Sequence, residues 1–431
     1  MKPFSDFSFL SAGLIFWVLI LALQPKLNAQ SIIGNEAQIQ HLGKMLSNNT
    51  VTSIYQDKLG FMWFGTFNGL NKYNGINVDM YYADPDDKSS LSDYYINKIT
   101  GDHLGNVWVC TKNGLNRYNL DYDNFTQYMH KPEKAKSITA GSITDALCDS
   151  ENRLWIFGDN ISLYDYKNDN FKNFIISEGN SELERADSYN HIFEDDKGRV
   201  WFLNHRKIYY YDSNSEKIQL FFDGNKHSLS SDNWYFMHIV QLDDERFLIS
   251  SNNAGVFEVK PYENNKLKSF EFRGINNSEL MNAQILQFCK DSQDRIWLTA
   301  ENKGVFVFNT QAELIMRLTH NRDNPQTIAN NSVWSVYEDD AKRIWLGTWQ
   351  SGVDIIDKYY RKFKHYYYRP GTNSLSHNNV KDVIEDKKGN LYISTDGGGL
   401  NYFDRQNGVF LRIHPQSLQA GKYKCQCRTA A

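Results

Sequence analysis

The sequence predicts an all-β fold, a β-propeller built from four-stranded blades. The main observation is an aromatic residue that recurs eight times along the 431 residues, at intervals of 45, 47, 46, 46, 50, 48 and 47. The recurring positions are Trp63, Trp108, Trp155, Trp201, Phe247, Trp297, Trp345 and Tyr392. A fixed period of this length is typical of repeat proteins, and four short strands per period are typical of propeller blades. No helical periodicity of any length competes with this pattern.

A tight turn precedes each recurring aromatic residue. An acid stands six residues before it in seven of the eight copies: Asp57, Asp102, Asp149, Asp195, Asp291, Asp339 and Asp386, with Gln241 in the remaining copy. Three residues after the acid comes Gly, Asn or Asp, which tolerate positive φ, except at Lys342. We expect the aspartate to accept hydrogen bonds from backbone N–H groups ahead of it. We expect the Trp to pack between adjacent blades.

Four short runs flank each turn. An alternating run precedes it, as at residues 51–54, and an apolar run follows it, as at 62–65. A third run begins with Gly and ends with an aromatic residue, as at 69–73. A looser fourth run comes last, as at 125–128 and 363–366. These runs are the expected strands of one blade.

The composition excludes some classes of function. Hydrophobic residues make up 41% and charged residues 23% of the chain, as in ordinary globular proteins, and aromatic residues are frequent at 14%. The formal net charge of −4 lacks the basic excess that nucleic-acid binding usually needs, so no nucleic-acid partner is expected.

Neither a metal site nor a catalytic site is evident in the sequence. Cys110, Cys148 and Cys289 fall inside predicted strands, where buried thiols are common, and Cys425 and Cys427 form a C-x-C pair without further ligands. The 11 histidines are scattered. Converging arginines or paired carboxylates of the kind that propeller hydrolases use are missing. We therefore predict no metal, no cofactor and no catalytic residue.

The first 29 residues are predicted to be a secretory signal. A mostly apolar run from Phe9 to Leu23 follows Lys2 and ends at Gln24, and Ala29 offers a small residue for cleavage. An uncleaved membrane anchor is the alternative, although the run is short for a full span. The segment predicts an exported, periplasmic protein.

The repeat resembles a known family. Its first copy contains Asn49, Val51 and Ile54, then Asp57, Gly60, Trp63, Gly65 and Thr66, then Gly69, Leu70 and Tyr73. These residues resemble the periplasmic two-component regulator propeller, the sensor region of hybrid two-component system histidine kinases from Bacteroidetes. Copies two, seven and eight match nearly as well. Copies three to six are more degraded, with Phe157 and Gly158, then Leu203 and Asn204, at the Gly-Thr position.

The resemblance implies a division of the chain. Residues 30–370 are expected to form a seven-bladed propeller, residues 371–410 to be the first blade of an incomplete second propeller, and residues 411–431 to be an irregular, truncated tail. A single eight-bladed ring stays open as the alternative. Because an open sheet edge is a hazard, residues 31–45 are expected to be able to add a strand to the last blade.

The resemblance also implies a function. Such sensors recognise oligosaccharides released from complex glycans and control genes for polysaccharide use. Full-length relatives are anchored in the inner membrane and can form homodimers, whereas this chain carries no kinase region. Its membrane contact would come only through the signal segment or through C-terminal parts that the chain lacks.

Candidate ligand residues lie in the loops before the inner strands and after the Trp strands. Aromatic faces stack on sugar C–H faces, and polar groups bond hydroxyls. The candidates are Tyr94, Tyr95, Tyr189, Trp234, Tyr235 and Trp334 before inner strands, and His205, Arg206, Trp349 and Gln350 after Trp strands. The neighbouring Asn97, Asn190, Phe67, Asn68, Lys112 and Asn113 share these loops. Trp349 is the favoured contact because it replaces a usually small loop residue. The alternative is that most of them cap the channel or pack between blades.

Three functions remain open at this point. The first is a ligand-sensing propeller of a glycan-responsive receptor. The second is a carbohydrate-active propeller enzyme, either a lyase or a glycosidase. The third is a scaffold that docks a partner protein.

Overall fold

The computed structural model describes residues 38–43, 45–176, 190–226, 234–252, 254–263, 266–267, 273–275, 279–280, 283–357 and 366–413. The predicted signal segment lies outside these residues. So does most of the predicted tail, although its first three residues, 411–413, belong to a strand instead of an irregular segment.

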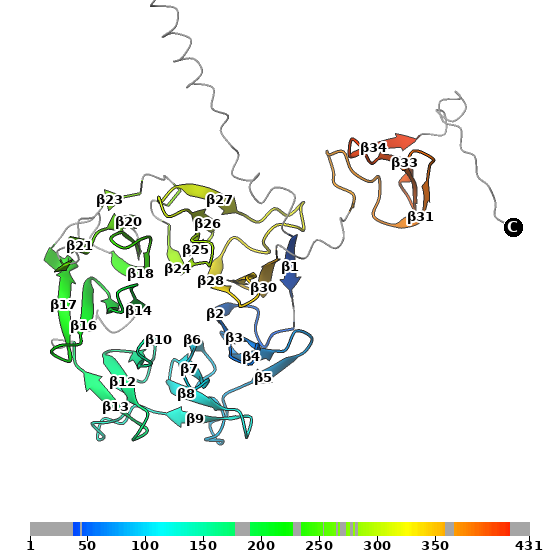
Figure 1. Ribbon diagram of the computed structural model, residues 1–431. Helices are drawn as coiled ribbons and strands as arrows, with labels where there is room; N and C mark the ends of the chain where they lie inside the picture. The colour runs from blue at the N-terminus through cyan, green and yellow to red at the C-terminus, as the bar shows by residue number, and fades with distance from the viewer. Residues whose placement is uncertain are drawn as a thin grey trace, which may run out of the picture.

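Eight four-stranded antiparallel sheets make up the described part of the chain, and each sheet is one blade (Figure 1). Blade one contains β2 (Val51–Gln56), β3 (Met62–Thr66), β4 (Gly69–Tyr73) and β5 (Val78–Tyr81). Blade two contains β6 (Ile96–Gly101), β7 (Val107–Thr111), β8 (Gly114–Asn119) and β9 (Asn124–Tyr128). Blade three contains β10 (Asp145–Cys148), β11 (Leu154–Phe157), β12 (Ile161–Asp165) and β13 (Asn170–Phe174). Blade four contains β14 (Asn190–Glu194), β15 (Val200–Asn204), β16 (Lys207–Asp212) and β17 (Lys217–Asp223), and a 3₁₀ turn (Gly224–Lys226) follows it.

The remaining blades follow the same order with two variations. Blade five contains β18 (Tyr235–Gln241), β19 (Phe247–Asn252), β20 (Gly255–Val259) and β23 (Arg273–Gly274), with the small hairpin of β21 (Tyr262–Glu263) and β22 (Lys266–Leu267) inserted. Blade six contains β24 (Ile285–Lys290), β25 (Ile296–Ala300), β26 (Gly304–Phe308) and β27 (Leu314–Leu318). Blade seven contains β28 (Val333–Glu338), β29 (Ile344–Thr348), β30 (Val353–Asp357) and β1 (Gln38–Leu42). Blade eight contains β31 (Val380–Glu385), β32 (Leu391–Thr395), β33 (Gly399–Asp404) and β34 (Val409–Ile413).

Seven blades close into a ring and the eighth lies outside it (Figure 1). The inner strands contact one another in the order β2, β6, β10, β14, β18, β24 and β28, and β28 contacts β2 again. Blade eight instead leaves Val380 and Val383 of its inner strand exposed, whereas the equivalent Val51 and Ile54 of blade one are buried. The prediction of seven blades plus an eighth repeat is confirmed, and the single eight-bladed ring is wrong.

An N-terminal strand completes the ring. β1 pairs antiparallel with β30, with Ile39 opposite Ile356 and His41 opposite Asp354. The expected strand from residues 31–45 is therefore present, and it takes the outer place in blade seven. The fourth run predicted at 363–366 does not hold that place: Tyr366 lies outside the strands, and 363–365 lie outside the described residues. We call the pairing of β1 with β30 the seam.

In the turns that have an Asp–Trp pair, the aspartate accepts backbone hydrogen bonds, as predicted, and it also accepts a hydrogen bond from the Trp indole. In blade one, Asp57 Oδ1 accepts hydrogen bonds from the backbone N–H groups of Leu59 and Phe61, both at 3.0 Å. Its Oδ2 accepts the Nε1–H of Trp63 at 2.7 Å. The same indole bond recurs at 2.7–2.8 Å in blades two, three, four, six and seven. The Trp residues lie in apolar clusters between neighbouring blades, which confirms their predicted packing role.

Blade five departs from this pattern, and the sequence alignment there is wrong by one residue. Gln241 pairs with Phe247 as Gln56 pairs with Met62, so Phe247 occupies the place of Met62 and not of Trp63. The Asp–Trp places are held by Leu242 and Leu248, both buried. Replacing both partners of a buried hydrogen bond by apolar groups leaves no polar group unsatisfied.

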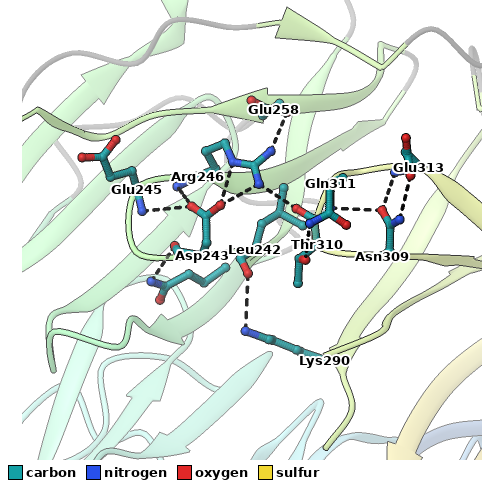
Figure 2. A network of polar contacts seen from close by, with 11 residues as sticks. Leu242, Asp243, Glu245, Arg246, Glu258, Lys290, Asn309, Thr310, Gln311 and Glu313 are labelled. Carbon is teal, nitrogen blue, oxygen red and sulfur yellow. Dashed lines mark hydrogen bonds and ion pairs between the residues drawn. The ribbon is translucent and has the colours of Figure 1, made fainter. Parts of the chain in front are cut away.

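Polar contacts then tie blade five to blade six at this turn (Figure 2). Arg246 Nε donates to Asp243 Oδ2 at 2.7 Å, and its Nη2 donates to the Thr310 carbonyl of blade six at 2.8 Å. Lys290 Nζ of blade six reaches the Leu242 carbonyl at 3.5 Å. The turn of blade five is therefore held by Arg246, although its Asp–Trp pair is missing.

Candidate functional site

The ring presents two faces. We call the face with the D-x-x-G turns the turn face. We call the opposite face, formed by the loops that precede inner strands and follow Trp strands, the loop face. The predicted ligand residues that the structure describes belong to the loop face.

A β-bulge aims Trp334 away from its own sheet. The pairing of β28 with β29 shifts register between Val333 and Ser335, so Trp334 has no partner opposite it in β29. Bulges re-aim side chains in this way. The same shift occurs at Thr52 and Asn97 of blades one and two, where the side chains bond to carbonyls of the next blade. The indole cannot make that bond because it lacks a short polar group.

Trp334 is one of four aromatic residues that gather here, with Phe67, Tyr95 and Trp349, and we call these four the aromatic cluster. The ring centroid of Trp334 lies 5.0 Å from that of Trp349 and 5.3 Å from that of Phe67. Phe67 also lies 5.3 Å from Trp349 and 4.6 Å from Tyr95. These residues come from three consecutive blades, seven, one and two, and each remains partly exposed. The structure thus brings together three predicted residues, Tyr95, Trp334 and Trp349, with Phe67.

The cluster offers both apolar and polar contacts. Lys112 lies over the face of Tyr95, with its Nζ 4.0 Å from the ring centroid. The Nε1–H of Trp334 is buried and has no hydrogen-bond partner among the described residues. Asn68, Asn113 and Gln350 are exposed in the same loops. Stacking surfaces bordered by donors and acceptors suit a ligand that has both C–H faces and hydroxyl groups.

The loop that carries Trp349 is fastened to the N-terminal segment. Gln350 N–H donates to Thr50 Oγ1 at 3.2 Å, and Gly352 N–H donates to the Asn49 carbonyl at 2.9 Å. Gly352 has φ +78°, and a Cβ there would lie 2.8 Å from the Leu42 carbonyl oxygen. Only glycine fits this approach, so the loop is held in one position beside the seam.

The remaining candidates form a second group at blades four and five. The rings of His205 and Tyr235 stack with centroids 5.7 Å apart at 18°. Arg206 Nε donates to the Trp234 carbonyl at 2.8 Å, and its guanidinium lies 5.2 Å from the Trp234 ring. Trp234 is only 2% exposed, so it packs between blades instead of facing a ligand.

Some predicted residues do not join either group. Tyr189 lies outside the described residues. Tyr94 is 58% exposed, next to the cluster residue Tyr95. Asn97 and Asn190 donate to the carbonyls of Ile143 and Gly158, at 2.7 and 2.6 Å, and so serve the blade contacts.

A polar belt around the inner strands was missed by the sequence reasoning. Its members occupy one repeat position in the seven blades: Ser53, Lys98, Asp145, His191, His238, Gln287 and Ser335. Asp145 Oδ2 accepts the backbone N–H of Ile192 at 3.0 Å and lies 2.9 Å from His191 Nδ1. Lys98 Nζ lies 3.6 Å from Asp145 Oδ1, and the rings of His191 and His238 lie 4.4 Å apart. Four titratable residues in succession at one repeat position were the signal in the sequence.

The belt perturbs the ionisation of its members. Burial opposes ionisation of Asp145, but Lys98 and the bond with His191 hold the pKa of that carboxyl below its usual range. Burial and the neighbouring His191 lower the pKa of His238 well below 6.5, so its imidazole is neutral. The Nδ1 atom of His238 is buried without a partner among the described residues. The belt therefore links the inner strands of neighbouring blades.

The turn face has a feature of its own. A hollow of about 390 Å³ lies between blades one and two, lined in part by Lys58, Leu59, Leu104, Arg117 and Leu120. None of the predicted ligand residues lines it.

The structure describes Cys110, Cys148 and Cys289 as free cysteines. Cys110 is buried, and burial raises the pKa of the Cys289 thiol to about 12. Within the described ranges, no three His, Cys, Asp or Glu side chains are grouped as a metal ion would require. The same residues include no helix that is long and apolar enough to cross a membrane.

Comparison with known proteins points to one family. The family described as "Two component regulator propeller" matches residues 45–68, 327–350 and 374–397, which are repeats one, seven and eight. A 47-residue stretch is 45% identical to histidine kinase P4 of Formosa agariphila, and it covers 11% of this chain and 3% of that protein.

Solved structures extend the likeness over most of the chain. The extracellular domain of a hybrid two component system from B. thetaiotaomicron is 25% identical with a TM-score of 0.62, over 88% of this chain and 49% of that one. Virginiamycin B lyase from Staphylococcus aureus shares the fold, with 14% identity and a TM-score of 0.54 over 74% of this chain and 99% of that one. The chain thus spans about half the length of the sensor domain it matches. Three of its repeats, one, seven and eight, match the two component regulator propeller family, and its ring resembles the propeller in the extracellular domain of that hybrid two component system.

Proposed function

We propose that this chain is the exported, ligand-sensing propeller region of a two-component sensor, and that it recognises oligosaccharides from complex glycans in the periplasm. The observation that carries the proposal is the aromatic cluster, in which Phe67, Tyr95, Trp334 and Trp349 meet at the loop face. Indole and phenol rings at such a site stack on sugar rings, and the exposed amides of Asn68, Asn113 and Gln350 in the same loops can bond to hydroxyl groups. In a sensor of this kind, the bound saccharide would control genes for polysaccharide use.

The test is a calorimetric titration of the purified chain with plant and host oligosaccharides, followed by variants. Trp349→Ala should weaken binding of any hit by roughly ten-fold, because a stacking surface worth about 1.4 kcal/mol is lost. Trp334→Phe keeps an aromatic ring of smaller area, so it should weaken binding by a smaller factor.

A matched control separates the site from general effects. Tyr122→Ala removes an aromatic ring that is 77% exposed in the β8–β9 turn, on the turn face, and should leave binding unchanged. Absence of binding to every oligosaccharide by a folded chain would count against the proposal. Cleavage of an oligosaccharide during the titration would favour a carbohydrate-active enzyme instead.

A further inference from the structure

Three parts of the chain that are far apart in sequence meet at one loop. This loop, residues 320–329, leads from blade six into blade seven, and His320 Nδ1 closes it on the Ile328 carbonyl at 2.8 Å. The seam strand β1 reaches it from one side. The linker of residues 366–369, which leads to blade eight, reaches it as well.

His41 joins the seam to this loop. Its Nε2 lies 2.9 Å from the Pro325 carbonyl and its Nδ1 lies 2.6 Å from Asp354 Oδ1. Both partners are acceptors, and only the imidazolium form can donate to both. Asp354 is fully buried, and its second oxygen accepts the N–H of Ala329 at 2.7 Å, at the end of the same loop. The seam strand and the loop therefore share one charged, hydrogen-bonded contact.

Tyr367 and Arg369 join the linker to the same loop. Tyr367 OH donates to Asn324 Oδ1 at 2.9 Å, and Arg369 Nη2 donates to Gln326 Oε1 at 3.3 Å. The guanidinium also lies 4.5 Å from the Tyr367 ring and bonds to its hydroxyl, so the two side chains act as a pair. Asn324, Pro325 and Gln326 are consecutive, which puts the contact with the seam between the two contacts with the linker.

We propose that loop 320–329 is a latch that couples the seam to the linker of blade eight. If either β1 or the linker moves, residues 324–326 move with it, and the contacts of these residues with the other segment change. Because such coupling is reciprocal, loosening the linker must loosen β1, and loosening β1 must loosen the linker. The Trp349 loop is fastened to residues 49–50, which follow β1 in sequence, so the loop face also borders this latch. A sensor built on this ring would have a physical route from its N-terminal seam to its C-terminal exit.

Hydrogen exchange of β1 in the full chain tests the coupling without any ligand. Tyr367→Phe removes one hydroxyl group, which bonds to Asn324 of the loop, and it changes no residue of β1. Exchange of the amides of residues 38–42 should then become faster by roughly five-fold, the change expected for loss of one hydrogen bond. Tyr368→Phe is the matched control. Within the described residues, the Tyr368 hydroxyl has no hydrogen bond, so this substitution should leave exchange in β1 unchanged.

A double-mutant cycle identifies the route. In a His41→Ala background the contact with Pro325 is gone, so adding Tyr367→Phe should change the exchange of β1 less than two-fold. The proposal would be overturned if Tyr367→Phe speeds exchange in loop 320–329 but not in β1. It would equally be overturned if the effect on β1 persists in full without His41. Neither result depends on whether the loop face binds a saccharide, so failure here and failure of the proposed function are distinguishable.

Discussion

One aspartate satisfies several buried donors in each of six turns. In blade six, Asp291 Oδ1 accepts the N–H groups of Gln293 and Arg295, and Oδ2 accepts the Trp297 Nε1–H at 2.7 Å and the Arg295 Nε–H at 2.6 Å. The carboxylate therefore links the turn, the buried indole and a guanidinium that covers the indole. Hydrogen bonds to a charged acceptor are stronger than neutral ones.

Replacing this carboxylate should be costly. We expect Asp291→Ala to lower the free energy of unfolding by about 2–4 kcal/mol, because it leaves the indole N–H and two turn amides without their acceptor. Urea unfolding followed by tryptophan fluorescence measures the loss. Asp386→Ala in blade eight is the comparison: Asp386 still closes its turn, but the aromatic residue there is Tyr392, which has no indole N–H to donate. A loss at Asp386 as large as at Asp291 would argue against the role of the indole bond.

The sequence predicted the turn bonds of the aspartate but not its second partner. Spacing alone shows that an acid and an aromatic residue recur together; it does not show that the indole N–H points back at the carboxylate. The error at Phe247 has the same origin. Matching by residue type favoured the aromatic Phe247, whereas the strand register places Leu242 and Leu248 at the pair positions. An apolar pair can replace a bonded polar pair, and no type-based alignment detects that exchange.

At the scale of strands, the β-bulge in β28 decides the candidate site. Trp334 was predicted on the loop face before the inner strand of its blade, but it lies inside that strand, β28; Tyr95 and Trp349 were predicted from their loops. Their meeting with Phe67 needs the bulge and the order of blades around the ring, which brings blade seven beside blade one. Sequence spacing carries no such information, because residues 67 and 349 are adjacent only after the ring closes.

A histidine of the inner strands should make the stability of the fold depend on pH. His238 faces His191, Asp145 and Lys98 from the neighbouring inner strands, and its pKa is lowered well below 6.5, first by burial and then by the charge of its neighbours. The unfolded chain takes up a proton near pH 6.5, and the folded chain does not. Stability attributable to His238 is therefore present above about pH 6.5 and falls as the pH drops below it, by up to about 1.4 kcal/mol per pH unit.

A variant isolates this contribution. His238→Gln copies Gln287, which holds the same belt position in blade six, and removes the titration. We expect the slope of unfolding free energy against pH between 6.5 and 5 to become shallower than in the parent chain, as measured by urea unfolding at each pH. His103→Gln alters an exposed imidazole and should leave the slope as it is. An unchanged slope in His238→Gln would show that His238 does not stay neutral in the folded chain, and the argument would then be wrong.

At the scale of the whole molecule, the ring depends on its N-terminus for closure. Without β1, blade seven would have three strands, and β30 would be an open edge with unpaired backbone groups. From the sequence, blade seven was expected to have a fourth run of its own at 363–366, and a strand from residues 31–45 was expected only because an open sheet edge is a hazard; residues 38–42 have no strong strand pattern of their own. Tertiary pairing, together with Ile39 packing against the cluster of blades six and seven, fixes β1 as a strand.

Blade eight does not share this dependence, and a pair of truncations separates the two. A chain that starts at residue 45 lacks β1 and the His41 contact with Asp354, so that a buried carboxylate loses its cationic partner. We expect its thermal midpoint to fall by several degrees, since the lost strand pairing and ion pair together are worth about 3 kcal/mol or more. We also expect concentration-dependent association through the open edge, visible by size-exclusion chromatography. A chain that ends at residue 370 lacks blade eight, whose inner strand leaves Val380, Val383 and Ile384 exposed. It should unfold at nearly the same midpoint as the parent and stay monodisperse to the same degree. If removing blade eight destabilises the ring more than removing β1 does, then the ring is not the closed seven-bladed unit that the inner-strand contacts describe.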